Sequence, residues 1–135
     1  MLLVDTCVLI DIADDDPIFA ERSAQCLVTH LPKGLLLSPV SFVELAPVFD
    51  GSVPLLDEFL AGVGVVVADE FGAVERLAAF KGWAHHITNK RAGNVRRRPV
   101  ADALIGALAL RHDGIITRNG EDFRSFYPKI VVVAP

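Results

Sequence analysis

The sequence predicts an α/β fold with a mainly parallel central sheet of about five strands and helices on both faces. Short, wholly apolar runs such as Leu35–Leu37 and Val65–Val67 alternate with longer stretches whose apolar residues recur at helical spacing. Strands that alternate with helices in this way are typical of a parallel sheet covered on both sides. The 135 residues fit one domain of ordinary size, residues 1–135.

The short apolar runs are the expected strands: Leu2–Val4, Leu35–Leu37, Val65–Val67, Ile115–Ile116 and Ile130–Val133. The expected helices cover residues 7–13, Pro17–His30, a segment from Pro39 that Pro47 kinks or ends, Val53–Ala61, Asp69–Ile87, Pro99–His112 and Glu121–Phe126. Two of them begin with an N-cap residue followed by proline, at Asp16-Pro17 and Ser38-Pro39. Thr88–Arg98 is polar and basic, and we expect a loop there. Core packing is expected for several apolar side chains: Ile18, Cys26, Leu27, Phe80 and Trp83.

Composition excludes several classes of protein. With 52% apolar and 22% charged residues, the chain can bury a core and is not expected to be disordered. No apolar run approaches the ~18 residues of a transmembrane helix, and no signal peptide is expected. Cys7 and Cys26 are expected to be reduced cytosolic thiols without the spacing of a zinc site. The net charge of −4 does not exclude nucleic acid, because a divalent metal can join carboxylates to an anionic substrate.

Acidic and polar residues recur where strands end. Asp5-Thr6 follows the first strand, Glu44 lies on the helix after the second, and Thr117-Arg118-Asn119 follows the fourth, with Asp122 close behind. Asp102 lies in the first turn of the helix before that strand. A parallel sheet brings such places to one crevice beyond its strand ends. Each acid alone has another explanation, as a helix cap, a surface residue or a dipole partner.

The conjunction of acids predicts a metal site. Several carboxylates close together in a low dielectric repel one another, and hard divalent cations such as Mg²⁺ or Mn²⁺ relieve that repulsion. A metal-activated water can then attack phosphorus, which is the chemistry of a metal-dependent nuclease.

The motifs that carry these acids resemble those of one family. They are Leu3-Val4-Asp5-Thr6, Ser38 to Leu45 (SPVSFVEL), Pro99 to Ala109 (PVADALIGALA) and Ile116 to Phe123 (ITRNGEDF). In this order the chain is similar to PIN-domain ribonucleases, most of all to the VapC-type toxins of bacterial toxin–antitoxin pairs. The resemblance implies a three-layer PIN-like fold and a Mg²⁺-dependent endoribonuclease, with Mn²⁺ as the other possible cofactor. It also implies a toxin of a type II system in the cytoplasm, forming a homodimer or a hetero-oligomer with its antitoxin.

The resemblance also assigns roles to residues. Asp5, Glu44 and Asp102 match the family's three metal-binding acids. Asn119 matches a fourth catalytic position that is often Asp, so the number of metals stays open, and Asp122 lies close enough in sequence to share that role. Thr6 and Thr117 are expected to position the acids or a metal-bound water.

A basic segment, Lys90 to Arg98, places five cations in nine residues just before the helix of Asp102. A charge run is usually a solvated loop. Here its position favours a second interpretation, in which Arg96, Arg97 and Arg98 hold RNA phosphates or meet an acidic antitoxin segment, with Arg118 in a smaller role of the same kind. Cys7 is expected to pack against the first strand, not to act as a nucleophile.

Other functions remain alternatives. A haloacid-dehalogenase-like phosphatase requires a second acid two residues after the first, where this chain has Cys7, and a receiver domain requires a late lysine that Lys129 does not match well. A stand-alone RNA-processing nuclease and a catalytically silent RNA- or protein-binding module stay open. A group of apolar positions could exceed the needs of one core and mark an interface: Ile12, Phe19, Val48, Leu55 and Phe59.

Overall fold

The computed structural model describes residues 1–90 and 100–135, apart from the side chains of residues 89 and 90, and it confirms the α/β prediction. The described strands form one sheet in the order β3-β2-β1-β4-β5, and every neighbouring pair is parallel. Their bounds are β1 Leu2–Val4, β2 Leu35–Leu37, β3 Val65–Val67, β4 Ile115–Ile116 and β5 Val132–Val133.

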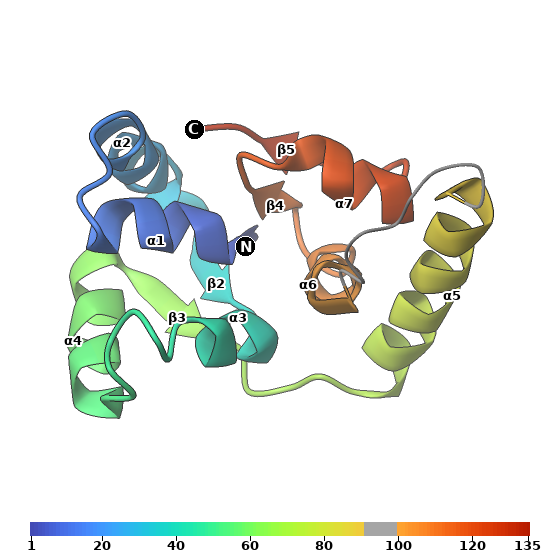
Figure 1. Ribbon diagram of the computed structural model, residues 1–135, viewed down its shortest axis with the longest axis horizontal. Helices are drawn as coiled ribbons and strands as arrows, with labels where there is room; N and C mark the ends of the chain where they lie inside the picture. The colour runs from blue at the N-terminus through green and yellow to red at the C-terminus, as the bar shows by residue number, and fades with distance from the viewer. Residues whose placement is uncertain (91–99) are drawn as a thin grey trace.

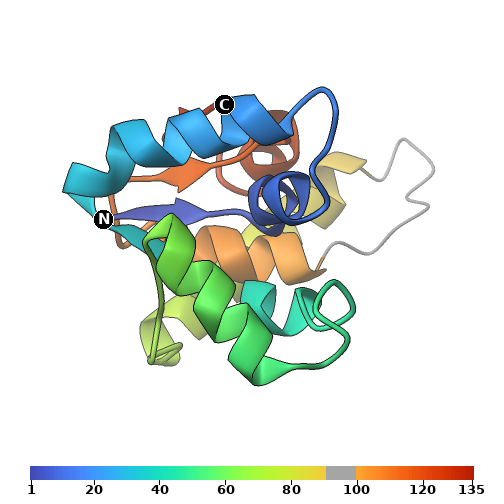
Figure 2. The ribbon, with the colours of Figure 1, turned by 90° about the vertical axis from the view of Figure 1, so that its left-hand side faces the viewer.

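Helices cover both faces of the sheet and make three layers (Figures 1 and 2). One face carries α1 (Thr6–Ala13), α2 (Ala20–His30) and α4 (Val53–Val63), and the other carries α5 (Ala73–Lys90), α6 (Val100–Ala109) and α7 (Gly120–Phe126). A 3₁₀ turn, Leu31–Lys33, follows α2, and the short helix α3 (Pro39–Glu44) follows β2. Within the described residues, no helix is both long and apolar enough to cross a bilayer.

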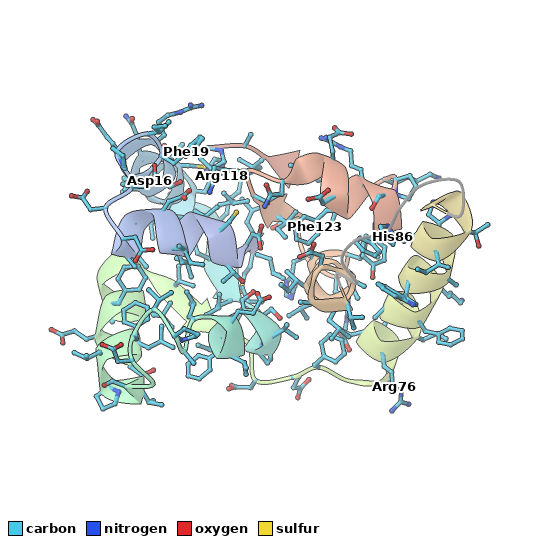
Figure 3. All side chains as sticks on the ribbon, in the orientation of Figure 1. Asp16, Phe19, Arg76, His86, Arg118 and Phe123 are labelled. Carbon is cyan, nitrogen blue, oxygen red and sulfur yellow. The ribbon has the colours of Figure 1, made fainter. Side chains whose placement is uncertain are left out.

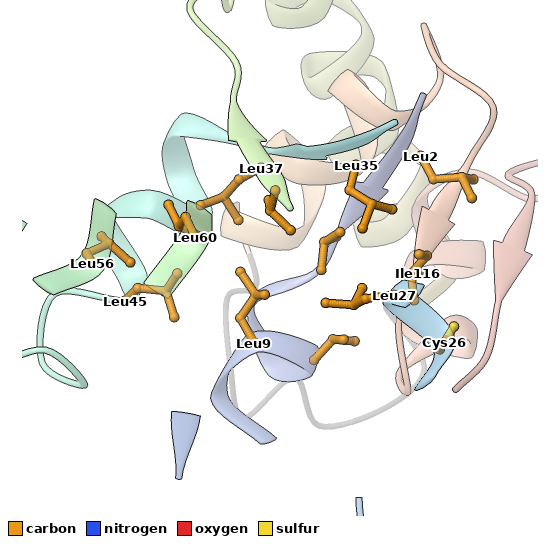
Figure 4. Packing of buried hydrophobic residues seen from close by; sticks show 13 residues of the cluster. Leu2, Leu9, Cys26, Leu27, Leu35, Leu37, Leu45, Leu56, Leu60 and Ile116 are labelled. Atoms are coloured by element: carbon orange, nitrogen blue, oxygen red, sulfur yellow. The ribbon is translucent and has the colours of Figure 1, made fainter. Parts of the chain in front are cut away.

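The strands are apolar throughout because both of their faces are buried. Leu2 and Val4 point into the first core with α1, α2 and α4, whereas Leu3 between them points into the second core with α5, α6 and α7. Figure 4 shows the first core, where Leu9 and Leu27 approach the sheet from the helices.

The ends of several helices differ from the prediction for local reasons. A helix was expected over Pro17–His30, but α2 begins at Ala20, because the Asp16 carboxylate accepts from the backbone N–H groups of Ile18 and Phe19 and holds residues 17–19 in a turn. A helix was expected over Asp69–Ile87, but α5 begins at Ala73, where the Gly72 N–H donates to Glu75 Oε2 at 2.8 Å, as in a capping box.

The remaining differences are at the ends of α5, α6 and the last strand and at two exposed side chains. Helix α5 continues through Thr88–Lys90, which were expected to be loop, and residues 91–98 of that expected loop lie outside the described residues. Helix α6 ends at Ala109 instead of His112, and only Val132–Val133 of the last apolar run pairs with β4. Ile18 and Phe80 are 68% and 72% exposed, so the prediction that they are buried was wrong.

Helices α5 and α6 approach each other closely around one aromatic ring. A Cβ atom at Gly82 would lie 2.4 Å from Tyr127 Cε1, and one at Gly106 would lie 2.5 Å from Tyr127 Cε2. Glycine is therefore required on both sides of the Tyr127 ring, whose hydroxyl donates to the Ala103 carbonyl at 2.5 Å. This packing fixes α6, the helix that carries Asp102.

Candidate active site

The centre of the sheet is a topological switch point. From β1 the chain continues outward through β2 and β3, and it returns on the other side of β1 to form β4 and β5. Ligands of open α/β sheets bind where the strand order reverses, beyond the carboxyl ends of the strands. At that point Asp5 follows β1 and Thr117 follows β4, and both are almost fully buried, at 5% and 1% exposure.

A chain of hydrogen bonds orients the Asp5 carboxylate. Thr117 Oγ1 donates to Asp5 Oδ2 at 2.6 Å, and Cys7 Sγ donates to the same oxygen at 3.1 Å. Thr117 Oγ1 in turn accepts from the Asn119 backbone N–H at 2.9 Å. Burial raises the pKa of Asp5 above its ordinary value of 3.8, and the hydrogen bonds from Thr117 and Cys7 oppose that rise. The first and fourth strand ends therefore meet in one network, as the sequence predicted.

Glu44 reaches the same place from α3. It is the last residue of that helix, its side chain is exposed, and Oε2 accepts from Thr6 Oγ1 at 2.5 Å. Helix α3 begins where the sequence predicted, because Ser38 Oγ accepts from the Val40 N–H at 3.1 Å as an N-cap. Thr6 thus connects the beginning of α1 to the carboxylate of Glu44.

The environment of Asp102 indicates that several acids of the site lie near one another. It is half-buried in the first turn of α6, and its pKa is raised from 3.8 to about 7, first by burial and then by the charges of Asp5, Glu44 and Asp122. Carboxylates on α3, α6, α7 and the end of β1 therefore lie within electrostatic reach of one another.

Asn119 and Asp122 lie on the turn after β4 and on α7. Asn119 is the N-cap residue of α7, its side chain makes no capping hydrogen bond, and it is exposed. Asp122 is also exposed, and its charge is one of those that raise the pKa of Asp102, after burial. Both residues line a cavity of about 440 Å³ together with Thr117.

The donor chemistry fits a hard divalent cation. Carboxylate oxygens are the ligands that Mg²⁺ and Mn²⁺ prefer, and burial together with the charges of neighbouring acids raises the pKa of Asp102, which a bound cation would oppose. In the described part of the chain, however, no three Asp, Glu, His or Cys side chains lie in a ready-made ion-binding group. Mg²⁺ usually binds through only one or two carboxylates and keeps several waters, so the donor set and this spacing are compatible with it.

Other residues predicted from the sequence have different environments. Arg96, Arg97 and Arg98 lie outside the described residues. The Arg118 guanidinium forms an ion pair with Asp11 at 2.8 Å. Burial and the neighbouring Asp5 raise the pKa of Cys7 to about 12, which makes this thiol a poor nucleophile, as expected.

His85 and His86 lie on α5, on the opposite side of the sheet from Cys7 on α1. His86 is buried, stacks on Phe126 with ring centroids 4.1 Å apart, and has Nδ1 2.9 Å from Ser125 Oγ. Trp83 also stacks on Phe126, which confirms its place in the core.

The sequence reasoning missed Asp11. This residue is 2% exposed, and its carboxylate binds Arg118 and also accepts from Ser23 Oγ at 3.0 Å. The signal was present, because Asp11 is an acid within an otherwise apolar run, and a buried charge requires a partner.

The apolar positions suggested as an interface are mostly not free surface. Leu55 is 53% exposed. Three others pack partly against the first core, namely Ile12, Val48 and Phe59, and Phe19 lies under the Arg118 guanidinium.

Comparisons with known proteins agree with this architecture. The family model described as PIN domain matches residues 2–127. The crystal structure of FitAcB from Neisseria gonorrhoeae superposes with a TM-score of 0.67 at 20% identity, covering 98% of this chain and 96% of that one. The structure of FitAB bound to an IR36 DNA fragment superposes with a TM-score of 0.65 at 20% identity, covering 100% and 95%. A search of curated proteins finds no match.

Proposed function

Because this chain belongs to the PIN-domain family, whose members are generally nucleases, we propose that it is a Mg²⁺-dependent endoribonuclease. Mn²⁺ is the other metal that its oxygen donors suit. The observation that carries the proposal is the crowd of acids at the switch point of the sheet, where Thr117 and Thr6 hold the carboxylates of Asp5 and Glu44. The raised pKa of Asp102, about 7, supports it, because it arises first from burial and then from the charges of Asp5, Glu44 and Asp122. Such a crowd destabilises a purely structural protein and serves a cation-dependent reaction.

The proposed roles follow the contacts. Asp5, Glu44 and Asp102 would hold the metal, directly or through its bound waters, and the metal would supply an activated water and neutralise charge on the phosphodiester. Thr117 fixes the rotation of the Asp5 carboxylate, and Thr6 fixes that of Glu44. Hydrolysis adds the water oxygen to phosphorus and breaks the bond to one ribose oxygen, which takes up a proton.

The fourth catalytic position is shared between two residues in this proposal. Asp122 contributes its charge to the acid cluster, as its effect on Asp102 supports. Asn119 contributes an uncharged amide at the cavity beside it, together with the backbone N–H that Thr117 accepts.

The proposed substrate is RNA, bound through Arg96, Arg97 and Arg98, which shortly precede Asp102 in the sequence. The proposed biological role is the toxin of a type II toxin–antitoxin system in the cytoplasm, assembled as a homodimer and inhibited by an antitoxin. The resemblance of four motifs to VapC-type toxins supports that role. It is also compatible with the likeness to FitAB, which was determined bound to DNA.

A cleavage assay tests the enzymatic proposal. Purified protein is incubated with single-stranded RNA, and in parallel with single-stranded DNA, in Mg²⁺, Mn²⁺ or EDTA. We expect RNA cleavage that requires metal and is lost in Asp5→Asn and Asp102→Asn, but kept in Asp57→Asn, a surface control on α4. Equal cleavage by the wild type and both site variants would overturn the assignment.

Calorimetry distinguishes an enzyme from a silent binding module. Titration of Mg²⁺ or Mn²⁺ into the metal-free protein should give binding heat that disappears in Asp102→Asn. No binding to the wild type would favour the binding-module alternative and would count against a metal-dependent nuclease.

A further inference from the structure

Arg118 lies between two residues of the site and is bound in a fixed geometry. Its Nε donates to Asp11 Oδ2 and its Nη2 to Asp11 Oδ1, both at 2.8 Å. Such a fork-to-carboxylate pair fixes both distance and orientation. The Asp11 side chain is 3% exposed and that of Arg118 is 30% exposed, so the carboxylate of this pair is buried while the arginine is partly open to water.

The same contact joins three parts of the fold. Asp11 belongs to α1, and its Oδ2 also accepts from Ser23 Oγ of α2 at 3.0 Å. The Arg118 guanidinium carbon lies 4.1 Å from the centre of the Phe19 ring, which is a cation–π contact. The turn that Asp16 caps places Phe19 there, and Figure 3 shows Asp16, Phe19 and Arg118 side by side.

The backbone on either side of Arg118 carries the site. Thr117 donates to the Asp5 carboxylate, and the Asn119 N–H donates to Thr117 Oγ1. A displacement of Arg118 therefore moves both residues of the β4–α7 turn relative to Asp5.

We propose that Arg118 is a positioning residue, which ties the β4–α7 turn to α1 through Asp11, and that it is not a phosphate-binding residue. The inference rests on the proposed function for its kinetic test. Its charge is matched by Asp11, and Asp5 and Asp16 are also within electrostatic reach, so a phosphate would have to displace a carboxylate to bind there.

Kinetics of RNA cleavage separate the two roles. In Arg118→Gln and Asp11→Asn we expect kcat to fall about 10- to 100-fold, as for a misplacement of about 1 Å, with the KM for RNA unchanged. Arg118→Lys should restore little activity, because lysine lacks the planar fork.

A phosphate contact predicts the opposite pattern. Arg118→Gln would then raise KM and reduce the salt slope of RNA binding by about 1, and Arg118→Lys would keep most of the affinity. Asp11→Asn would release the guanidinium and lower KM. Any of these results would overturn the positioning role.

Amide hydrogen exchange gives a readout that does not need activity. We expect the Asn119 amide to lose protection in Arg118→Gln, Arg118→Lys and Asp11→Asn. It should keep protection in Arg124→Gln, whose ion pair with Glu121 lies on the exposed side of α7. Unchanged protection of Asn119 in all three variants would refute the inference. If the wild type does not cleave RNA, the proposed function fails while the exchange experiment still decides the role of Arg118.

Discussion

Asp102→Asn should stabilise the metal-free protein near neutral pH. The side chain has a pKa of about 7 in the fold against an ordinary value of 3.8, so at pH 4 to 7 the folded state holds a proton that the unfolded state has released. The free energy of unfolding therefore falls as pH rises through this window. The contribution is fully present below about pH 4 and is lost by about pH 7. Asparagine resembles the neutral acid in shape and does not titrate.

The magnitude follows from the pKa. A rise from 3.8 to about 7 corresponds to ~4 kcal/mol at ~1.4 kcal/mol for each pH unit. Because the side chain is only half-buried, solvent screening reduces this value, and we expect about half of it, ~2 kcal/mol.

Urea unfolding in EDTA at pH 4.5, 6, 7 and 8 measures the effect. The difference in unfolding free energy, wild type minus Asp102→Asn, should fall by ~2 kcal/mol across this range. Adding Mg²⁺ at pH 7.5 should stabilise the wild type and leave the variant unchanged, since a ligand stabilises the state that binds it. Parallel pH curves for the two proteins would refute the reasoning, because they would mean that Asp102 ionises normally and that the acids are not crowded.

Two further predictions concern packing and hydrogen bonding. Gly106→Ala should destabilise by ~1–3 kcal/mol in urea unfolding, because its Cβ would lie 2.5 Å from the Tyr127 ring. Gly62→Ala, with nothing within 4 Å, should instead stabilise by ~0.5–1 kcal/mol, and equal effects would contradict the packing argument. Thr117→Val should cost ~1–3 kcal/mol at pH 7.5 by removing a donor from the buried Asp5, and should weaken Mg²⁺ binding in calorimetry, whereas Thr117→Ser keeps the hydroxyl and both properties.

The sheet was predictable because its strands are buried on both faces. Leu35–Leu37 is wholly apolar, and such a short run between turn signals has few other interpretations. Helix ends were less predictable. The start of α5 depends on the Gly72 N–H and the Glu75 side chain, and no hydrophobic pattern reports that contact.

The buried side of α5 could not be read from apolar spacing. Phe80 and Trp83 are three residues apart on one helix, yet Phe80 is 72% exposed and Trp83 stacks on Phe126. The buried side carries small residues, because Ala79 is 5% exposed and Gly82 lies against the Tyr127 ring. Helical periodicity alone does not distinguish a large apolar residue that is buried from one that lies at the rim of the same face.

The site was partly predictable for a topological reason. Asp5 and Thr117 directly follow neighbouring parallel strands, so their proximity follows from strand order alone. The partner of Arg118 could not be found in this way, because Asp11 is 107 residues away and lies within a helix. The position of Arg118 beside a site of acids favoured a contact with the substrate, whereas in the structure Arg118 forms an ion pair with the buried Asp11.

Replacement of Asp11 and of Asp102 by asparagine should change the free energy of unfolding in opposite directions. Asp11→Asn removes the charge that holds Arg118, so it should destabilise the metal-free protein by ~1–3 kcal/mol at pH 7.5. Asp102→Asn removes a charge that burial and, among the described residues, the charges of neighbouring acids disfavour, so it should stabilise. An acidic residue that lowers the stability of the fold indicates a functional role, whereas an acidic residue that raises stability can be explained by the fold alone. Urea unfolding of both variants in EDTA therefore separates the proposed metal ligand from the structural acid, and a loss of stability in both would contradict the assignment of Asp102 to a cation site.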